Sequence, residues 1–94
     1  MELNDILNVL TQAAELAQKG GILTLEEAGV ANNAIELLKS QNVVEIKQGA
    51  NALVGIADIG QKRGAYTLKD AYIIYVAVSS LAECFEPKET TEKE

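Results

Sequence analysis

The chain of 94 residues contains no histidine, one cysteine and one proline. Histidine is the commonest general base and the commonest metal ligand, so its absence removes the most frequent routes to acid–base catalysis and metal binding. The phosphate-binding glycine loop and the Gly-x-Ser-x-Gly nucleophile turn are also missing. We therefore expect no catalytic residue, no metal site and no cofactor, and we expect that the protein is not an enzyme.

Cys84 has no second cysteine with which to form a disulfide within the chain. An unpaired thiol suits a reducing compartment, and free cysteines are most often small core residues, so we expect Cys84 in the core. No apolar run approaches the roughly 20 residues that span a membrane. We expect a cytoplasmic protein with no membrane contact.

Cationic residues are too few for nucleic-acid binding. The chain carries 8 Lys and Arg against 14 Asp and Glu, for a net charge of −6. A protein that binds phosphates needs a cationic face to displace counterions, so we expect no nucleic-acid partner. The acids leave one alternative open, an acidic inhibitor of a host nucleic-acid-binding protein, although they are dispersed along the chain.

What the chain does contain is an internal repeat, because residues 8–38 recur at 51–81 after a shift of 43 positions. The identical pairs are Asn8/Asn51, Leu10/Leu53, Ala14/Ala57, Gln18/Gln61, Lys19/Lys62, Gly21/Gly64, Thr24/Thr67, Leu25/Leu68, Ala28/Ala71, Ala34/Ala77 and Leu38/Leu81. Unrelated segments of this length would share roughly two identities. Each half therefore predicts the structure of the other.

Apolar residues at helical spacing predict a helix at the start of each repeat. In the first repeat the stripe is Leu3, Ile6, Leu7, Leu10, Ala13, Ala14 and Ala17, and the same stripe returns 43 positions later with smaller residues. The later helix contains three glycines within or next to this stripe, at 49, 55 and 60. A glycine in the interior of a helix lowers its stability by about 1 kcal/mol relative to alanine. They indicate either close approach by another helix or a helix that starts late or frays.

Both of these helices run into the sequence Gln-Lys-x-Gly-x-x-Thr-Leu. The glycine tolerates the left-handed conformation that ends helices, and the threonine is expected to cap a new helix with an acid three residues later. The predicted cap and turn residues are Gly21, Thr24, Glu27, Gly64, Thr67 and Asp70. Leu23 and Tyr66 are placed for a hydrophobic staple onto the new helix. The cations Lys19, Lys62, Arg63 and Lys69 near the turns are expected to offset helix dipoles.

The second helix of each repeat follows from its threonine. Its apolar positions are Leu25, Ala28, Ala31, Ile35 and Leu38 in the first repeat, and Leu68, Ala71, Tyr75, Val78 and Ala82 in the second. Residues 72–78 have the composition of a strand. Their twin at 29–35 does not, so the duplication favours a helix.

The predicted fold is therefore all-α, a duplicated helical hairpin that forms a four-helix domain with helices at about 3–18, 25–40, 43–60 and 68–85. We expect one domain at 1–85, made of repeats at about 3–40 and 43–85, with a disordered acidic tail at 86–94. Since the linker around 40–42 is short, the second hairpin should pack directly on the first.

The second repeat differs from the first in one helix. The run Tyr-Ile-Ile-Tyr-Val at 72–76 covers every side of the helix, where the first repeat has Gly-Val-Ala-Asn-Asn. A small four-helix domain can bury only one stripe of each helix, and tyrosine suits interfaces. We predict an interface at Tyr72, Ile73, Tyr75 and Val76 and a non-enzymatic protein that interacts with proteins as a homo-oligomer. The alternative is a central core helix with no partner.

The two turns also resemble degenerate EF-hand loops. Gly64, Tyr66, Thr67 and Asp70, like Gly21, Leu23, Thr24 and Glu27, fall on the loop's glycine, central hydrophobic residue, next position and final acid. The first three ligand positions hold Leu16, Gln18 and Gly20 in one loop and Ile59, Gln61 and Arg63 in the other. Calcium needs several oxygen ligands. The resemblance therefore implies at most a metal-free EF-hand-like regulatory binding module.

The motif Lys-x-Gly-x-x-Thr-Leu-x-x-Ala before an apolar helix is similar to small, uncharacterised helical proteins of bacteriophages and large DNA viruses. The similarity covers about eleven residues in each repeat and transfers no active site. It implies a viral structural or accessory component, located in the host cytoplasm or the virion.

Overall fold

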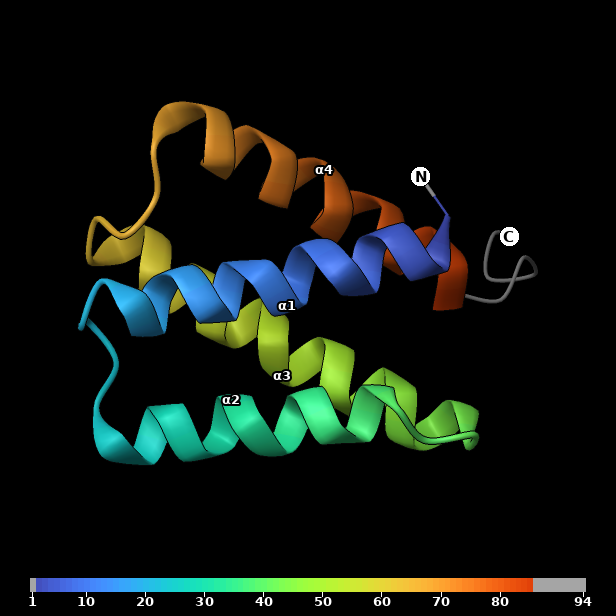
Figure 1. The fold of residues 1–94 in the computed structure, drawn as a ribbon. Helices are drawn as coiled ribbons and strands as arrows, with labels where there is room; N and C mark the ends of the chain where they lie inside the picture. Colours follow the sequence, from blue (N-terminus) through green and yellow to red (C-terminus); the bar gives the residue numbers. More distant parts are fainter. Residues whose placement is uncertain (1, 86–94) are drawn as a thin grey trace, which may run out of the picture.

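The computed structural model describes residues 2–85, which form four helices and no strand (Figure 1). The helices are α1 (Leu3–Lys19), α2 (Leu25–Leu38), α3 (Val43–Lys62) and α4 (Leu68–Phe85). The all-α, four-helix class is confirmed, and the predicted boundaries agree to within two residues. Residues 72–78 are helical in spite of their β propensity. The tail expected at 86–94 lies outside the described residues.

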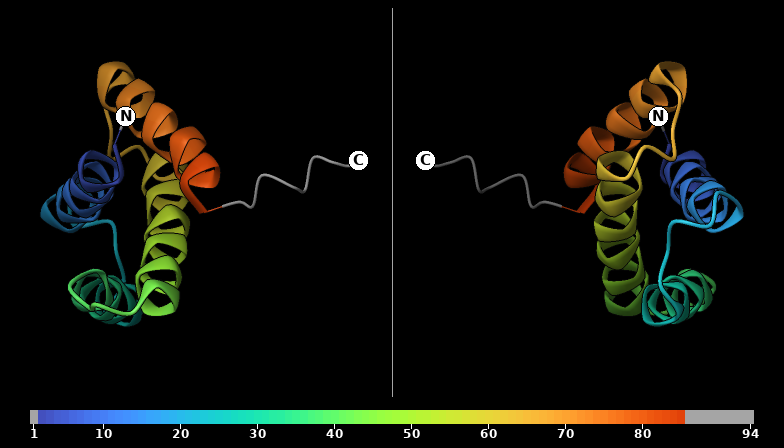
Figure 2. Two further views of the ribbon diagram at one scale, coloured as in Figure 1. Left: turned by 90° about the vertical axis from the view of Figure 1, so that its right-hand side faces the viewer. Right: turned by 90° about the vertical axis from the view of Figure 1, so that its left-hand side faces the viewer.

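The two repeats exchange packing partners. The second helix of each repeat packs on the first helix of the other, so that α2 lies against α3 and α4 lies against α1 (Figures 1 and 2). Helices α1 and α3 also pack on each other, at the centre. The second repeat therefore packs directly on the first, as expected from the short linker. The two helices of one repeat touch each other much less, so each hairpin is open.

The core is built from equivalent positions of the two repeats. The buried residues of α1 are Ile6, Leu10, Ala13, Ala14 and Ala17, all of which belong to the stripe seen in the sequence. The positions 43 residues later in α3 are buried as well, namely Gly49, Leu53, Ile56, Ala57 and Gly60. Many of these side chains are small, which lets helix backbones approach one another closely.

The first helix of each repeat ends at a left-handed glycine. The φ angle is +74° at Gly21 and +79° at Gly64. The N–H of Ile22 donates to the carbonyl of Ala17, and the N–H of Gly21 donates to the carbonyl of Gln18. This is the Schellman arrangement, and the same two bonds recur 43 positions later. Each repeat therefore turns its chain by the same backbone geometry.

Threonine caps the second helix of each repeat. The N–H of Glu27 donates to Thr24 Oγ1 at 3.1 Å, and the N–H of Thr24 donates to Glu27 Oε1 at 2.9 Å, which completes a capping box. In the second repeat Asp70 and Thr67 form the same pair at 3.0 and 3.4 Å. The longer second distance reflects the shorter aspartate side chain.

Gly49 allows α2 to lie directly on α3. A Cβ atom at this position would stand 2.6 Å from the carbonyl oxygen of Ala34 and 2.9 Å from the Cβ of Leu37. The equivalent position in α1 is Ile6, a large side chain that is fully buried. A Cβ at Gly55 would meet no atom within 4 Å. Close approach is therefore the reason for the glycine at 49, and α3 neither starts late nor frays.

Substitution of these two glycines by alanine should have opposite effects. Gly49→Ala forces α2 away from α3 and is expected to lower the free energy of unfolding by about 1–3 kcal/mol. Gly55→Ala, the matched control, only removes backbone freedom and is expected to raise it by up to about 1 kcal/mol. Urea unfolding followed by circular dichroism measures both. Equal effects of the two substitutions would contradict the close packing at Gly49.

Candidate functional site

Helix α4 exposes four large apolar side chains, and three of them lie on one side of the helix. Leu68 is 90% exposed, Tyr72 is 67% exposed and Tyr75 is 68% exposed. Their spacing of four and three residues puts them on one side of the helix. We call these three residues the α4 ridge. Tyrosine and leucine exposed together on one helix face are typical of a surface that contacts another protein.

The four residues that the sequence singled out do not share one face. Tyr72 and Tyr75 belong to the α4 ridge. Ile73, which is 38% exposed, lies on the side of α4 that meets α1 and lines a small hollow with Leu16. Val76 is partly buried. The structure thus brings the two tyrosines together with Leu68, which the sequence reasoning did not include.

The apolar stripe that the sequence suggested for α4 is not its buried face. That stripe was Leu68, Ala71, Tyr75, Val78 and Ala82, whereas the buried residues are Ile74, Ala77 and Leu81. If this stripe is taken as the core face, it is displaced from the buried face by about one residue around the helix. Apolar residues on every side of α4 made several stripes equally plausible. The identities Ala34/Ala77 and Leu38/Leu81 were the signal for the buried face, because both repeats keep them.

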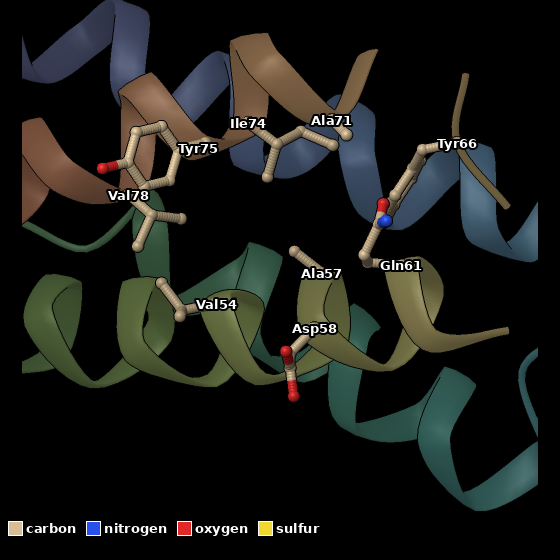
Figure 3. A pocket seen from close by; sticks show the side chains of 9 residues that line it. All are labelled: Val54, Ala57, Asp58, Gln61, Tyr66, Ala71, Ile74, Tyr75 and Val78. Atoms are coloured by element: carbon tan, nitrogen blue, oxygen red, sulfur yellow. The ribbon is translucent and has the colours of Figure 1, made fainter. Parts of the chain in front are cut away.

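A groove runs between α3 and α4 beside the ridge. Its volume is about 230 Å³, and Figure 3 shows Ile74 and Val78 of α4 pointing toward α3. Tyr66 stands at one end, and Tyr75 lies along the rim. The carboxylate of Asp58 points away from α4 and pairs with the Lys62 ammonium at 3.2 Å. The interior of the groove is therefore almost entirely apolar.

The first repeat has the same groove between α1 and α2, with a volume of about 210 Å³. The paired lining residues, first repeat before second, are Ala14/Ala57, Glu15/Asp58, Gln18/Gln61, Leu23/Tyr66, Ala28/Ala71, Ala31/Ile74, Asn32/Tyr75 and Ile35/Val78. The lining is shared, but Asn32 in place of Tyr75 makes the first groove more polar, and Ala31 is smaller than Ile74. The grooves exist because the two helices of one repeat touch each other only slightly.

Tyr66 connects the end of the α3–α4 groove to α1. Its hydroxyl donates to the carbonyl of Ala13 at 2.8 Å, and its ring lies on Gly60, where a Cβ would stand 2.6 Å from the hydroxyl oxygen. Burial raises the pKa of the Tyr66 hydroxyl, and the negative charge of Asp70 adds to the effect. Tyr66 is thus more than the local staple expected from the sequence.

Arg63 joins the two turns. Its guanidinium donates to the carbonyl of Ile22 at 2.8 Å and to the two carboxylate oxygens of Glu27 at 2.7 and 3.2 Å. The expectation that Arg63 only offsets a helix dipole was therefore incomplete. The first repeat has Gly20 at the equivalent position and cannot form the reciprocal contact. Glu27 serves as helix cap and as ion-pair partner at once.

The connection between helices differs from an EF-hand loop. Helix α1 continues to Lys19 and α3 continues to Lys62, so the EF-hand ligand positions at Gln18 and Gln61 are helical. Within residues 2–85 no group of three His, Cys, Asp or Glu side chains is placed to hold a metal ion. The turns are capped helix–turn–helix connections.

Cys84 is exposed, so its expected position in the core is wrong. It lies in the last turn of α4, beyond the buried Leu81. None of the four helices combines the length and the apolar character that crossing a membrane requires, as far as the described residues go.

Comparison of the chain with models of protein families, with characterised proteins and with solved structures finds no match. The site therefore has to be interpreted from its own geometry.

Removal of the Tyr66 hydroxyl tests the contact between the groove and α1. Tyr66→Phe leaves the Ala13 carbonyl without this donor and is expected to lower the free energy of unfolding by about 0.5–1.5 kcal/mol. Tyr75→Phe is the matched control, because that ring is mostly exposed. Urea unfolding at low micromolar concentration measures both. An equal, negligible effect of the two substitutions would show that the bond contributes nothing.

The ion pair between the turns predicts a pH dependence. The pKa of Glu27 is lowered, first by the hydrogen bond from Arg63 and then by the bond from the Thr24 backbone N–H. A carboxyl of this kind stabilises the fold above its unfolded pKa of about 4.3, and the stabilisation is lost as pH falls through the lower folded value. Arg63→Met should therefore reduce the loss of stability on acidification.

Urea unfolding at a series of pH values between neutral and strongly acidic measures this slope. Lys19→Met is the control, since it removes one positive charge near the same turns without touching Glu27. A slope in Arg63→Met equal to that of the unsubstituted protein would rule out the Arg63 contribution.

Proposed function

We propose that the protein is a non-enzymatic interaction protein that self-associates through α4. The observation that carries the proposal is the α4 ridge, where Leu68, Tyr72 and Tyr75 stand in solvent on one side of the helix. The ridge tyrosines correspond to Gly29 and Asn32 in the first repeat, so the exposed aromatic side chains belong to one repeat only, whereas Leu68 is matched by the equally exposed Leu25. Large exposed apolar groups in a small acidic protein favour a contact that covers them.

The composition of the grooves supports a binding role over a catalytic one. Apart from the hydroxyls of two tyrosines, the polar side chains at the α3–α4 groove are Asp58, which is paired with Lys62, and Gln61. Neither combines with a neighbouring nucleophile and base, the arrangement on which covalent catalysis depends. An apolar, open surface with few polar groups suits the burial of side chains from another protein.

We place this function in the cytoplasm. The support is the single exposed thiol of Cys84, which suits a reducing compartment. If the sequence similarity to phage and viral proteins reflects common origin, the protein is a structural or accessory component that assembles in the host cytoplasm or the virion.

Sedimentation velocity from low to high micromolar concentration tests self-association. We expect the sedimentation coefficient of the unsubstituted protein to rise with concentration. The double substitution Tyr72→Glu with Tyr75→Glu should weaken association at least tenfold, because an interface depends on a few large side chains of this kind. Circular dichroism should be unchanged, because both rings are largely exposed. Asn32→Glu with Asn33→Glu is the matched control, which adds the same charges to the exposed face of α2.

The salt dependence distinguishes a second copy from a foreign cationic partner. Two copies with a net charge of −6 each repel, so added salt should strengthen their association by screening. Association that appears only with a basic protein and weakens with salt would contradict self-association. A protein that stays monomeric at high micromolar concentration would do the same.

A further inference from the structure

Most tertiary contacts of this protein run between the two repeats. Helix α2 packs on α3, and α1 packs on both α3 and α4, whereas the two helices of one repeat touch each other only slightly. The core cluster draws its side chains from all four helices, among them Leu10 and Ala34 of the first repeat and Leu53 and Leu81 of the second. Each repeat is therefore the binding partner that completes the other.

The side-chain hydrogen bonds at the turns follow the same division. Arg63 donates to Glu27 and to the Ile22 carbonyl, and Tyr66 donates to the Ala13 carbonyl, so each of these bonds joins one repeat to the other. None of these bonds involves the linker at 39–42. A second repeat that comes from another copy of the chain offers the same donors and the same apolar side chains.

The linker between the repeats is mostly exposed and is held by local bonds. Ser40 Oγ donates to Glu45 Oε1 at 2.6 Å, and the Asn42 side chain accepts from the N–H of Val44 at 2.8 Å. The φ angles of Lys39 and Asn42 are −86° and −92°. The linker thus lacks the left-handed glycine that fixes the turn inside each repeat, and its four residues span about 13 Å when extended.

We propose that two copies of this chain swap their second repeats, so that the first repeat of each copy folds with the second repeat of the other. Domain swapping of this kind is a low-cost route to a dimer, because the contacts of the monomer are reused. The swap requires that the linker opens while the chains fold. It does not use the α4 ridge, so it goes beyond the self-association proposed above and is independent of it.

The protein concentration during folding decides between the monomer and the swapped dimer. A short linker holds one repeat near the other at an effective concentration of the order of 1 mM. A second copy competes when the protein folds at a comparable concentration, or when the linker is unable to close. Once formed, the swapped dimer separates slowly, because the repeats come apart only when the shared core opens.

Shortening the linker tests the swap. Deletion of residues 40–42 leaves only Lys39 between α2 and α3, whereas an antiparallel helix pair is joined by roughly 2–5 residues. We expect this variant to sediment as a dimer at low micromolar concentration with an unchanged helix content. Insertion of a short Gly-Ser segment after Gln41 is the matched control and should leave a monomer. Both variants also carry Tyr72→Glu and Tyr75→Glu, which remove association through the α4 ridge.

Cleavage of the linker distinguishes a swapped dimer from two intact copies that lie side by side. Residues 39–42 are replaced by a protease recognition sequence of the same length, again with Tyr72→Glu and Tyr75→Glu, and the protein is refolded from urea at about 1 mM. Cleavage of the dimer should halve its mass without loss of helicity, because each half is a complete pair of repeats. The monomer from the same refolding is the control and should keep its mass.

Four outcomes overturn the swap. They are a folded monomer after deletion of residues 40–42, a refolded sample without dimer, a dimer that keeps its mass after cleavage, and a cleaved monomer that falls apart. The last would show that the repeats do not suffice to hold each other. If the deletion variant does not fold, the cleavage result decides. The α4 ridge is tested separately, by the sedimentation of the unsubstituted protein, so the two proposals fail independently.

Discussion

The exchange of packing partners between the repeats is the constraint on which the other features of this protein depend. A left-handed glycine and a capped threonine turn each second helix away from the first helix of its own repeat, so it packs on the other repeat instead. Neither repeat has a complete core alone, because the buried stripe of α1 is covered by α3 and α4. The same exchange leaves a groove between the two helices of each repeat.

The size of single side chains at equivalent positions makes the two repeats unequal. Gly49 lets α2 pack closely onto α3, whereas its counterpart Ile6 is a large, fully buried side chain. Helix α4 packs less extensively than α2 and meets α3 only slightly. Much of its circumference therefore stays uncovered, and this is where the second repeat carries its tyrosines. A difference in the extent of packing and a difference in surface chemistry thus coincide in one helix.

Two contacts reach from the turn of the second repeat to the first repeat, and one of them holds a residue that lines the α3–α4 groove. Arg63 bonds to Glu27 and to the Ile22 carbonyl, while Tyr66 bonds to the Ala13 carbonyl. The first repeat has Gly20 and Leu23 at the equivalent positions, so it cannot return either contact. The Arg63 contacts join the two turns, and the Tyr66 bond fixes one end of the groove against α1.

The sequence by itself determined the helical class, the four boundaries, the turns and the caps. These features depend on residues close together in the chain, such as Thr24 with Glu27. The duplication supported each of them with an equivalent segment 43 positions away. It did not determine which side of α4 is buried, because apolar residues surround that helix. Nor did it reveal that Leu68 stands in solvent, that Arg63 reaches Glu27, or that Cys84 is exposed. Only the tertiary structure decided these points, since each depends on which helix lies opposite. A contact between residues 36 positions apart, such as that of Arg63 with Glu27, produces no periodic pattern in the sequence.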